Sequence, residues 1–153
     1  MEWSFRVIHL FPALAQVKKF TQDKLETLIR TAKDDFINKN KLAGTNAVDN
    51  LTMKQFNTGT LWVDSLGADG DRIRGMTADV MFADEVQDMM PNALGNATKI
   101  LTAAKYGQTA QGVQVYFGTP KSRNSHFAAM WDISDQRYYH LGCKNCNETY
   151  PFY

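Results

Sequence analysis

The residues of this chain best suited to chemistry are two adjacent acids, Asp84 and Glu85, which follow a short apolar run. The run, Val80–Ala83, is apolar at every position, as expected of a strand that is buried on both faces. Open α/β sheets bind ligands at the carboxyl ends of their strands, so both carboxylates would face a ligand. This is the pattern of a Walker B element, in which Asp84 orients Mg²⁺ and Glu85 polarises the water that attacks the γ-phosphate of ATP. The alternative is an ordinary strand that ends in solvated acids.

Strand and helix patterns alternate around these acids. Runs rich in strand-forming residues occupy positions 5–11, 51–56, 60–66, 80–83 and 113–117. Helical patterns run from Pro12 to Phe20, from Thr21, which can cap a second helix, to Ile29, from Pro91 to about residue 106, and from Ser125 to Trp131. The turn Asn57-Thr58-Gly59 joins two of the strands as a hairpin. The sequence therefore predicts an α/β fold with a largely parallel sheet, flanking helices and an inserted β-hairpin.

Composition limits the classes of function. The chain has 153 residues, enough for one core, with 44% hydrophobic and 22% charged residues, as in ordinary globular domains. The net charge of +1 gives no global field for nucleic acid, so any contact with DNA would be local. No apolar run has the length of a membrane span, and the two cysteines indicate a reducing, cytoplasmic setting.

Three further blocks accompany the acids in a fixed order. Ile73-Arg74-Gly75 precedes them, Gly118-Thr119-Pro120 ends the next strand, and Asn124-Ser125-His126-Phe127 follows, with Trp131 four residues later. In this order the blocks resemble the ATPase domain of the large terminases of tailed phages, the motors that package DNA into capsids. The resemblance runs from about Val7 to Trp131 and includes the first strand and helix.

The resemblance implies a P-loop NTPase-like fold of the ASCE division and a role for each block. Glu85 would activate water, Asp84 would bind Mg²⁺, and Thr119 would sense the γ-phosphate of ATP. Arg74 would act as an arginine finger on the nucleotide of a neighbouring subunit. Simpler interpretations remain open: Arg74 as a surface arginine, and Thr119 as part of an ordinary turn. The implied partners are double-stranded DNA, the small terminase subunit, the portal protein and further copies in the motor, in the host cytoplasm.

The last residues carry a separate motif, His140-x-x-Cys143-x-x-Cys146. We expect residues 1–135 to form a partial terminase ATPase domain and residues 136–153 a tail with a zinc half-site. Some terminases have a similar cysteine pair, with proline where this chain has Lys144. A structural zinc site needs four ligands, so this site would need another residue or chain. The alternative is a pair of free thiols.

One expected element is missing. The sequence contains no Gly-x-x-x-x-Gly-Lys-Ser/Thr loop, the Walker A element that holds the phosphates of ATP. We therefore expect the fold without its Walker A strand and helix, little or no ATP hydrolysis by the chain alone, and activity with the remaining part of a large subunit. Apolar surface beside Phe82 and Phe117 would then be open to a partner. The alternatives are a helicase-like P-loop ATPase fragment and a non-catalytic module that binds DNA or a partner.

Overall fold

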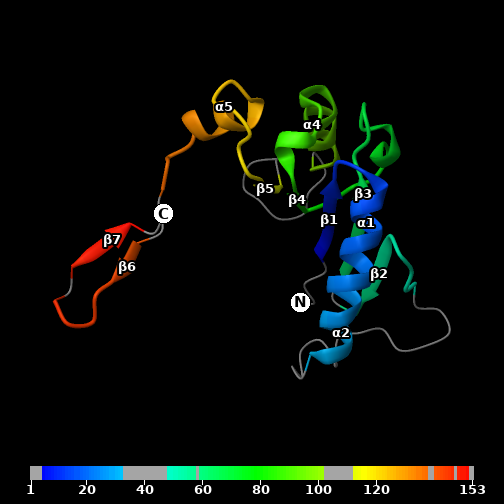
Figure 1. Ribbon diagram of the computed structural model, residues 1–153. Coiled ribbons are helices and arrows are strands. Elements are labelled where there is room, and N and C mark those ends of the chain that lie inside the picture. Colours follow the sequence, from blue (N-terminus) through cyan, green and yellow to red (C-terminus); the bar gives the residue numbers. More distant parts are fainter. Residues whose placement is uncertain are drawn as a thin grey trace. The chain divides into compact units, whose positions relative to one another are not determined.

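The chain divides into two compact units, Met1–Thr119 and Pro120–Tyr153 (Figure 1). The structure, a computed structural model, describes residues 5–32, 48–57, 59–101, 112–137, 140–146 and 148–151. The expected loop at 38–50 lies mostly outside these residues, as do positions 102–106 of the helix expected to reach residue 106 and most of the loop that follows it.

The first unit is built on a five-stranded sheet in the order β2-β3-β1-β4-β5. Its strands are β1 (Phe5–Phe11), β2 (Met53–Phe56), β3 (Gly59–Ser65), β4 (Val80–Ala83) and β5 (Val113–Tyr116). All neighbours are parallel except β2 and β3. The predicted α/β fold with a mostly parallel sheet is confirmed. The β2–β3 hairpin is also present, but β3 pairs with β1 and belongs to the main sheet, so only β2 is an added edge strand.

One face of the sheet is covered by a continuous helical segment (Figure 1). It consists of α1 (Leu14–Lys19), the π-helical turn η1 (Phe20–Leu25) and α2 (Glu26–Thr31). Val17 packs with Phe11 of β1 and Val63 of β3, which places the segment over these two strands. The break expected at Thr21 does not occur. Instead of capping a new helix, the buried Thr21 hydroxyl donates to the Leu51 carbonyl at 3.1 Å.

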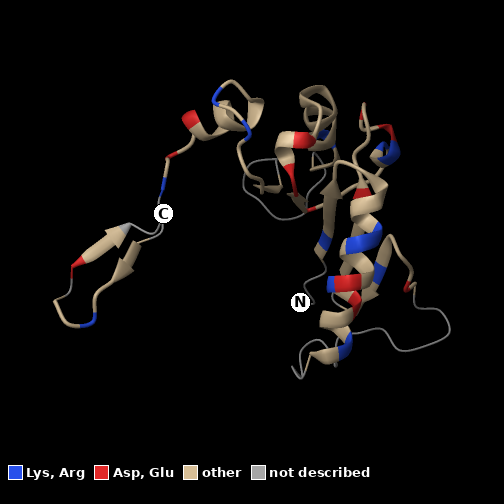
Figure 2. Ribbon diagram, viewed as in Figure 1, with Lys and Arg blue, Asp and Glu red and all other residues tan. Residues whose placement is uncertain are grey.

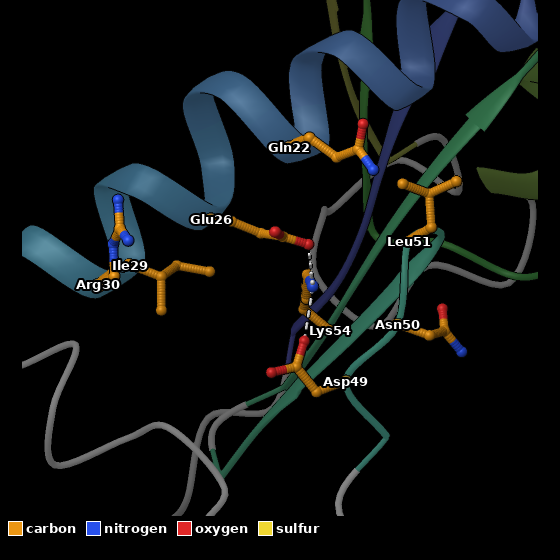
Figure 3. A pocket seen from close by; sticks show the side chains of 8 residues that line it. All are labelled: Gln22, Glu26, Ile29, Arg30, Asp49, Asn50, Leu51 and Lys54. Atoms are coloured by element: carbon orange, nitrogen blue, oxygen red, sulfur yellow. Dashed lines mark hydrogen bonds and ion pairs between the residues drawn. The ribbon is translucent and has the colours of Figure 1, made fainter.

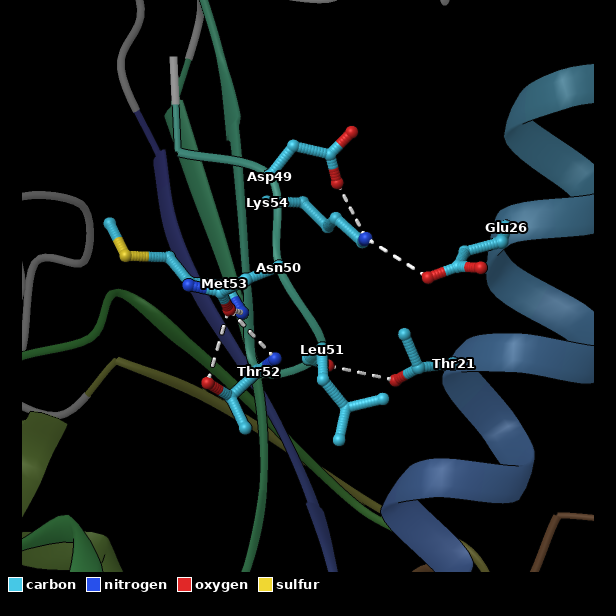
Figure 4. Close-up of polar contacts among 8 residues, drawn as sticks. All are labelled: Thr21, Glu26, Asp49, Asn50, Leu51, Thr52, Met53 and Lys54. Atoms are coloured by element: carbon cyan, nitrogen blue, oxygen red, sulfur yellow. Dashed lines mark hydrogen bonds and ion pairs between the residues drawn. The ribbon is translucent and has the colours of Figure 1, made fainter. Parts of the chain in front are cut away.

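A buried lysine also ties this helical segment to the β2 edge (Figure 4). The Lys54 Nζ lies 2.5 Å from Asp49 Oδ1 and 3.4 Å from Glu26 Oε1, so both carboxylates compensate its burial. These side chains border a pocket, shown in Figure 3, which is lined by Gln22, Glu26, Ile29, Arg30, Asp49, Asn50, Leu51 and Lys54. None of the expected site residues lines this pocket, because β3 and β1 separate the β2 edge from β4.

The other face of the sheet carries Ile8, Leu10 and Met81, which are fully buried. These side chains alternate along their strands with those that face α1. The elements available to cover them are η2 (Asp71–Ile73), η3 (Val86–Asp88), α4 (Pro91–Ala97) and η4 (Thr98–Leu101). α4 begins at Pro91 as predicted, because proline suits the first helical turn.

The second unit contains α5 (His126–Asp132) and a hairpin of β6 (His140–Gly142) and β7 (Thr149–Pro151). The helix starts as predicted, since Ser125 caps it by accepting a hydrogen bond from Ala128 N at 3.2 Å. His126 is the first residue of α5. No helix in the described part of the chain is long and apolar enough to cross a membrane. Figure 2 shows charges of both signs along α1, η1 and α2, in keeping with the low net charge.

A buried ion pair joins the amino ends of β1 and β4. Arg6 meets the carboxylate of Asp79 in a bidentate arrangement, with Nη2 2.7 Å from Oδ1 and Nε 3.0 Å from Oδ2. The Arg6 backbone N–H adds a third hydrogen bond to Oδ2 at 2.9 Å. The Asp79 side chain is fully buried, so its charge must be stabilised by hydrogen-bond donors such as these.

Replacing Asp79 should therefore destabilise the first unit strongly. We expect Asp79→Ala to lower the free energy of unfolding by about 3–5 kcal/mol, because it leaves the Arg6 guanidinium without its buried partner. The measurement is urea unfolding followed by circular dichroism. The matched control is Asp135→Ala, which removes the exposed partner of Arg137 and should cost less than about 1 kcal/mol. Equal effects of the two substitutions would contradict this assignment.

Candidate functional site

Asp84 leaves the sheet at the carboxyl end of β4, between β1 and β5. Its backbone N–H donates to the Leu10 carbonyl of β1 at 2.9 Å. Along the chain, β1 is followed by β2 and β3, which lie on one side of β1, whereas β4 and β5 lie on its other side. Such a reversal opens a crevice between the carboxyl ends of β1 and β4, and α/β sheets bind ligands in crevices of this kind. Asp84 lies at this point.

The Asp84 carboxylate has a different neighbour on each oxygen. Oδ1 accepts the Glu85 backbone N–H at 2.9 Å, whereas Oδ2 lies 3.8 Å from Nε2 of His9. The side chain is 35% exposed, so solvent reaches it. Mg²⁺ is commonly held by one or two carboxylates together with water and substrate phosphates. A partly exposed single carboxylate fits that kind of binding, although the described residues form no cluster of three metal-ligating side chains.

His9 was missed by the sequence analysis. It is a single histidine in an apolar strand, and its ring stacks on Phe11 and meets the edge of Phe20, with centroid distances of 4.7 and 4.8 Å. Burial lowers the pKa of His9 below its usual value of 6.5, and the nearby Asp84 charge opposes this only in part. Its Nε2 is buried, and no hydrogen-bond partner for it exists among the described residues. A neutral imidazole therefore borders the Asp84 carboxylate.

Glu85 occupies an unusual backbone conformation, with φ 57° and ψ 45°. A left-handed conformation is uncommon for a residue other than glycine and is often found at functional sites. The next residues form η3, whose Val86 N–H donates to the Phe117 carbonyl at 3.0 Å. The turn that carries Glu85 is thus held against the end of β5, which leads into Gly118 and Thr119.

Gln87 links the two turns through its side chain, a role that the sequence did not indicate. Its Nε2 donates to the Glu85 carboxylate, and its Oε1 accepts the Thr119 backbone N–H at 3.1 Å. The structure therefore brings together three of the four residues expected at the nucleotide site: Asp84 and Glu85 are adjacent, and the Gln87 side chain bridges Glu85 and Thr119. The only sequence signal for Gln87 was that its side-chain amide comes two residues after Glu85.

Arg74 is not drawn into this group. It ends η2, where its Nε lies 2.7 Å from Asp71 Oδ1, and 68% of its side chain is exposed. Among the described residues its ion-pair partner is thus Asp71 and neither Asp84 nor Glu85, and most of the guanidinium side chain faces solvent.

The apolar surface expected beside Phe82 and Phe117 is present on the described residues. These two rings stack at a centroid distance of 6.1 Å, and Phe117 remains 45% exposed. Val113 at the start of β5 is 54% exposed. β5 is the edge strand of the described sheet, and the segment α1–α2 covers β1 and β3 rather than this part of the face.

The cysteine pair lies in the turn between β6 and β7. Backbone hydrogen bonds from Asn145 and Cys146 lower the pKa of the Cys143 thiol, and both cysteines are free. His140 is opposite Pro151 at the other end of the hairpin. Among the described residues no three His, Cys, Asp or Glu side chains gather as a metal site, so His140, Cys143 and Cys146 do not form the expected set of zinc ligands. The residues present do not fit a closed zinc site.

A mostly parallel α/β sheet with paired acids at its carboxyl edge is consistent with a P-loop-like nucleotide-binding domain. A family model described as phage terminase large subunit gpA, ATPase domain, matches residues 5–153, and the chain belongs to this family. A comparison with curated proteins found no match. The family match extends past Trp131, where the motif resemblance ended, and includes the β6–β7 hairpin. It also favours a terminase over the alternative of a helicase fragment.

The low pKa of His9 predicts how stability depends on pH in the metal-free protein. Below pH 6.5 the unfolded chain binds a proton that folded His9 resists, so stability falls as the pH decreases through this window and is regained above it. We expect His9→Phe, which suits the aromatic neighbours, to reduce the loss of Tm between pH 7 and 5. Thermal unfolding at several pH values is the measurement. An unchanged slope in the variant would show that other groups cause the acid sensitivity.

Proposed function

We propose that this chain is part of a P-loop ATPase of the ASCE division that couples ATP hydrolysis to the movement of double-stranded DNA into a phage capsid. The observation that carries this proposal is the contact between the turn after β4 and the turn after β5. It brings Glu85 within one side chain of Thr119. An ATPase motor needs such closeness between the group that activates water and a loop that can move.

In this proposal each acid has a separate task. Asp84 would hold Mg²⁺ through its partly exposed carboxylate, and the metal would neutralise charge on the phosphates of ATP. Glu85 would orient the attacking water as a general base. Thr119 would respond to the γ-phosphate, since its backbone is already tied to the Glu85 turn by Gln87.

Arg74 would act between subunits rather than within one. Its exposure suits a guanidinium that stabilises the transferring phosphoryl group of a neighbouring copy. Its ion pair with Asp71 is itself exposed and so costs little to break. The proposal therefore requires several copies in the working motor.

The phosphate-binding loop would come from residues beyond these 153, in the remaining part of the large subunit. The exposed edge of β5, with Phe117 and Val113, offers a place for a further strand. The small terminase subunit, the portal protein and DNA would be the other partners, in the host cytoplasm. Zinc has no role in this proposal, because the cysteine turn does not supply a complete set of ligands.

The central test is ATP hydrolysis with and without a segment that carries a Walker A loop. The chain alone should show little or no turnover, and addition of the segment should restore it. Glu85→Gln should then lower kcat by about 10²-fold or more, because the general base is lost. Glu148→Gln, in the second unit, is the matched control and should retain activity. Turnover by the isolated chain, or full activity of Glu85→Gln, would refute the proposed role.

The intersubunit role of Arg74 is tested by mixing variants. We expect Arg74→Ala to reduce turnover in the assembled motor by about 10³-fold, the usual worth of an arginine finger. Mixing it with Glu85→Gln copies should recover part of the activity, because some interfaces then contain an intact arginine and an intact glutamate. Arg30→Ala, which removes another exposed arginine, serves as the control. Absence of recovery would mean that Arg74 acts within its own subunit or not at all.

A further inference from the structure

Gln87 uses both ends of its amide at once. The Nε2 group can only donate, and it faces the acceptor-only Glu85 carboxylate; the Oε1 atom can only accept, and it faces the Thr119 N–H at 3.1 Å. The opposite orientation of the amide would place an oxygen against a carboxylate and an NH₂ group against an N–H. Chemistry therefore fixes the orientation, and the amide cannot turn without losing both hydrogen bonds.

The backbone around Gln87 is held independently of this side chain. Val86 is fully buried and donates to the Phe117 carbonyl at 3.0 Å. Within the turn, Asp88 N–H donates to the Glu85 carbonyl at 2.9 Å. Two of the hydrogen bonds that join the turns after β4 and β5 therefore differ in kind. The Val86 link is made between backbone groups and is buried, whereas the Gln87 link is made through a side chain and can be broken without unfolding the turn.

The Gln87 link also depends on the state of Glu85. A hydrogen bond to a carboxylate is stronger than one between neutral groups, so the charged Glu85 side chain is the stronger of the two partners of Gln87. If that carboxylate turns away, for example toward a bound water, the amide loses the partner that fixes its orientation. The Thr119 N–H then loses a well-placed acceptor.

We propose that Gln87 is a positioning residue that couples the orientation of the Glu85 carboxylate to the loop beginning at Thr119. We call the two hydrogen bonds of the Gln87 amide, to the Glu85 carboxylate and from the Thr119 N–H, the latch. While Glu85 accepts from Gln87, the Thr119 backbone is held to the turn after β4. When the Glu85 carboxylate moves away, both hydrogen bonds are lost. Thr119 is the last residue of the first unit. The role of this coupling in ATP hydrolysis rests on the proposed function, but the coupling itself does not.

The first experiment uses the chain alone, without nucleotide. The exchange rate of the Thr119 amide hydrogen is measured by NMR in the wild type, Gln87→Met, Glu85→Ala and the double variant. Gln87→Met keeps the length of the side chain but removes both polar ends. It should accelerate exchange at Thr119 by about 2- to 10-fold, the effect of losing one hydrogen bond. Glu85→Ala should act in the same direction, and the double variant should match Gln87→Met, because both substitutions break one path.

One amide and one variant serve as controls. The Phe117 N–H, which donates to the Ala83 carbonyl at 2.8 Å, should keep its protection in every variant. Gln22→Met, at an exposed glutamine of η1, should leave Thr119 unchanged. The coupling is overturned if Glu85→Ala does not affect the Thr119 amide, if the two effects add, or if Phe117 loses protection together with Thr119, since Gln87 would then only support the strand end.

The second experiment measures function in the chain supplemented with the Walker A segment. Gln87→Met should increase the ratio of the ATP hydrolysis rate without DNA to the rate with DNA. The KM for ATP should change less than about twofold. Gln87→Asn, with its amide one methylene nearer the backbone, should not rescue the wild-type ratio. If the ratio is unchanged, the coupling has no role in the motor. Coupling in the NMR experiment together with full activity of Glu85→Gln would leave the latch intact and refute the proposed function instead.

Discussion

The site depends on the ion pair between Arg6 and Asp79, because this pair sets the register of β4 against β1. Asp79 N–H donates to the Arg6 carbonyl at 2.7 Å, and the Asp79 carbonyl accepts Val113 N–H at 3.0 Å. The amino ends of β1, β4 and β5 therefore meet at one buried aspartate. A shift of one residue would turn every side chain of β4 to the other face. The carboxylate of Asp84 would then leave His9 and the crevice.

The two edge strands of the sheet, β2 and β5, differ in how far other residues cover them. At the β2 edge, Lys54 and Thr21 tie the helical segment α1–α2 down, and polar groups find partners. At the β5 edge, Phe117 and Val113 stay exposed in the described structure. An exposed apolar edge strand is a liability unless it is covered. The closed edge therefore supports the domain, whereas the open edge is where we propose that a further strand and the phosphate-binding loop add.

The sequence predicted what depends on local pattern. All five strands of the main sheet carry clear apolar or strand-forming runs, and Pro91 and Ser125 mark helix starts by their own chemistry. The position of Asp84 and Glu85 at the end of β4 followed from the same pattern. The hairpin was also visible, but not the pairing of β3 with β1, because register between distant strands has no local signal.

What the sequence did not reveal depends on contacts between distant residues. Thr21 looked like a helix cap, yet its hydroxyl finds the Leu51 carbonyl, and the helix continues through a π-helical turn. His9 gains its low pKa only from burial among residues of η1 and β4. Gln87 gains importance only because β5 lies beside β4. The zinc half-site stays a prediction: its spacing in the sequence is local, but the β6–β7 hairpin pairs His140 with Pro151, away from the turn that holds the cysteines.

The turns after β4 and β5 illustrate why a site of this kind needs two types of connection. If only the buried backbone hydrogen bond from Val86 to Phe117 existed, the turns would move as one body. A change in the orientation of Glu85 could then not alter the backbone at Thr119. If only the Gln87 amide existed, the loss of one hydrogen bond would let the strand ends separate and disorder the acids. With both, one bond preserves the geometry of Asp84 and Glu85 while the other is free to break. A strained Glu85 backbone next to a replaceable side-chain contact is therefore a reason to look for a switch at Thr119 and not for greater stability.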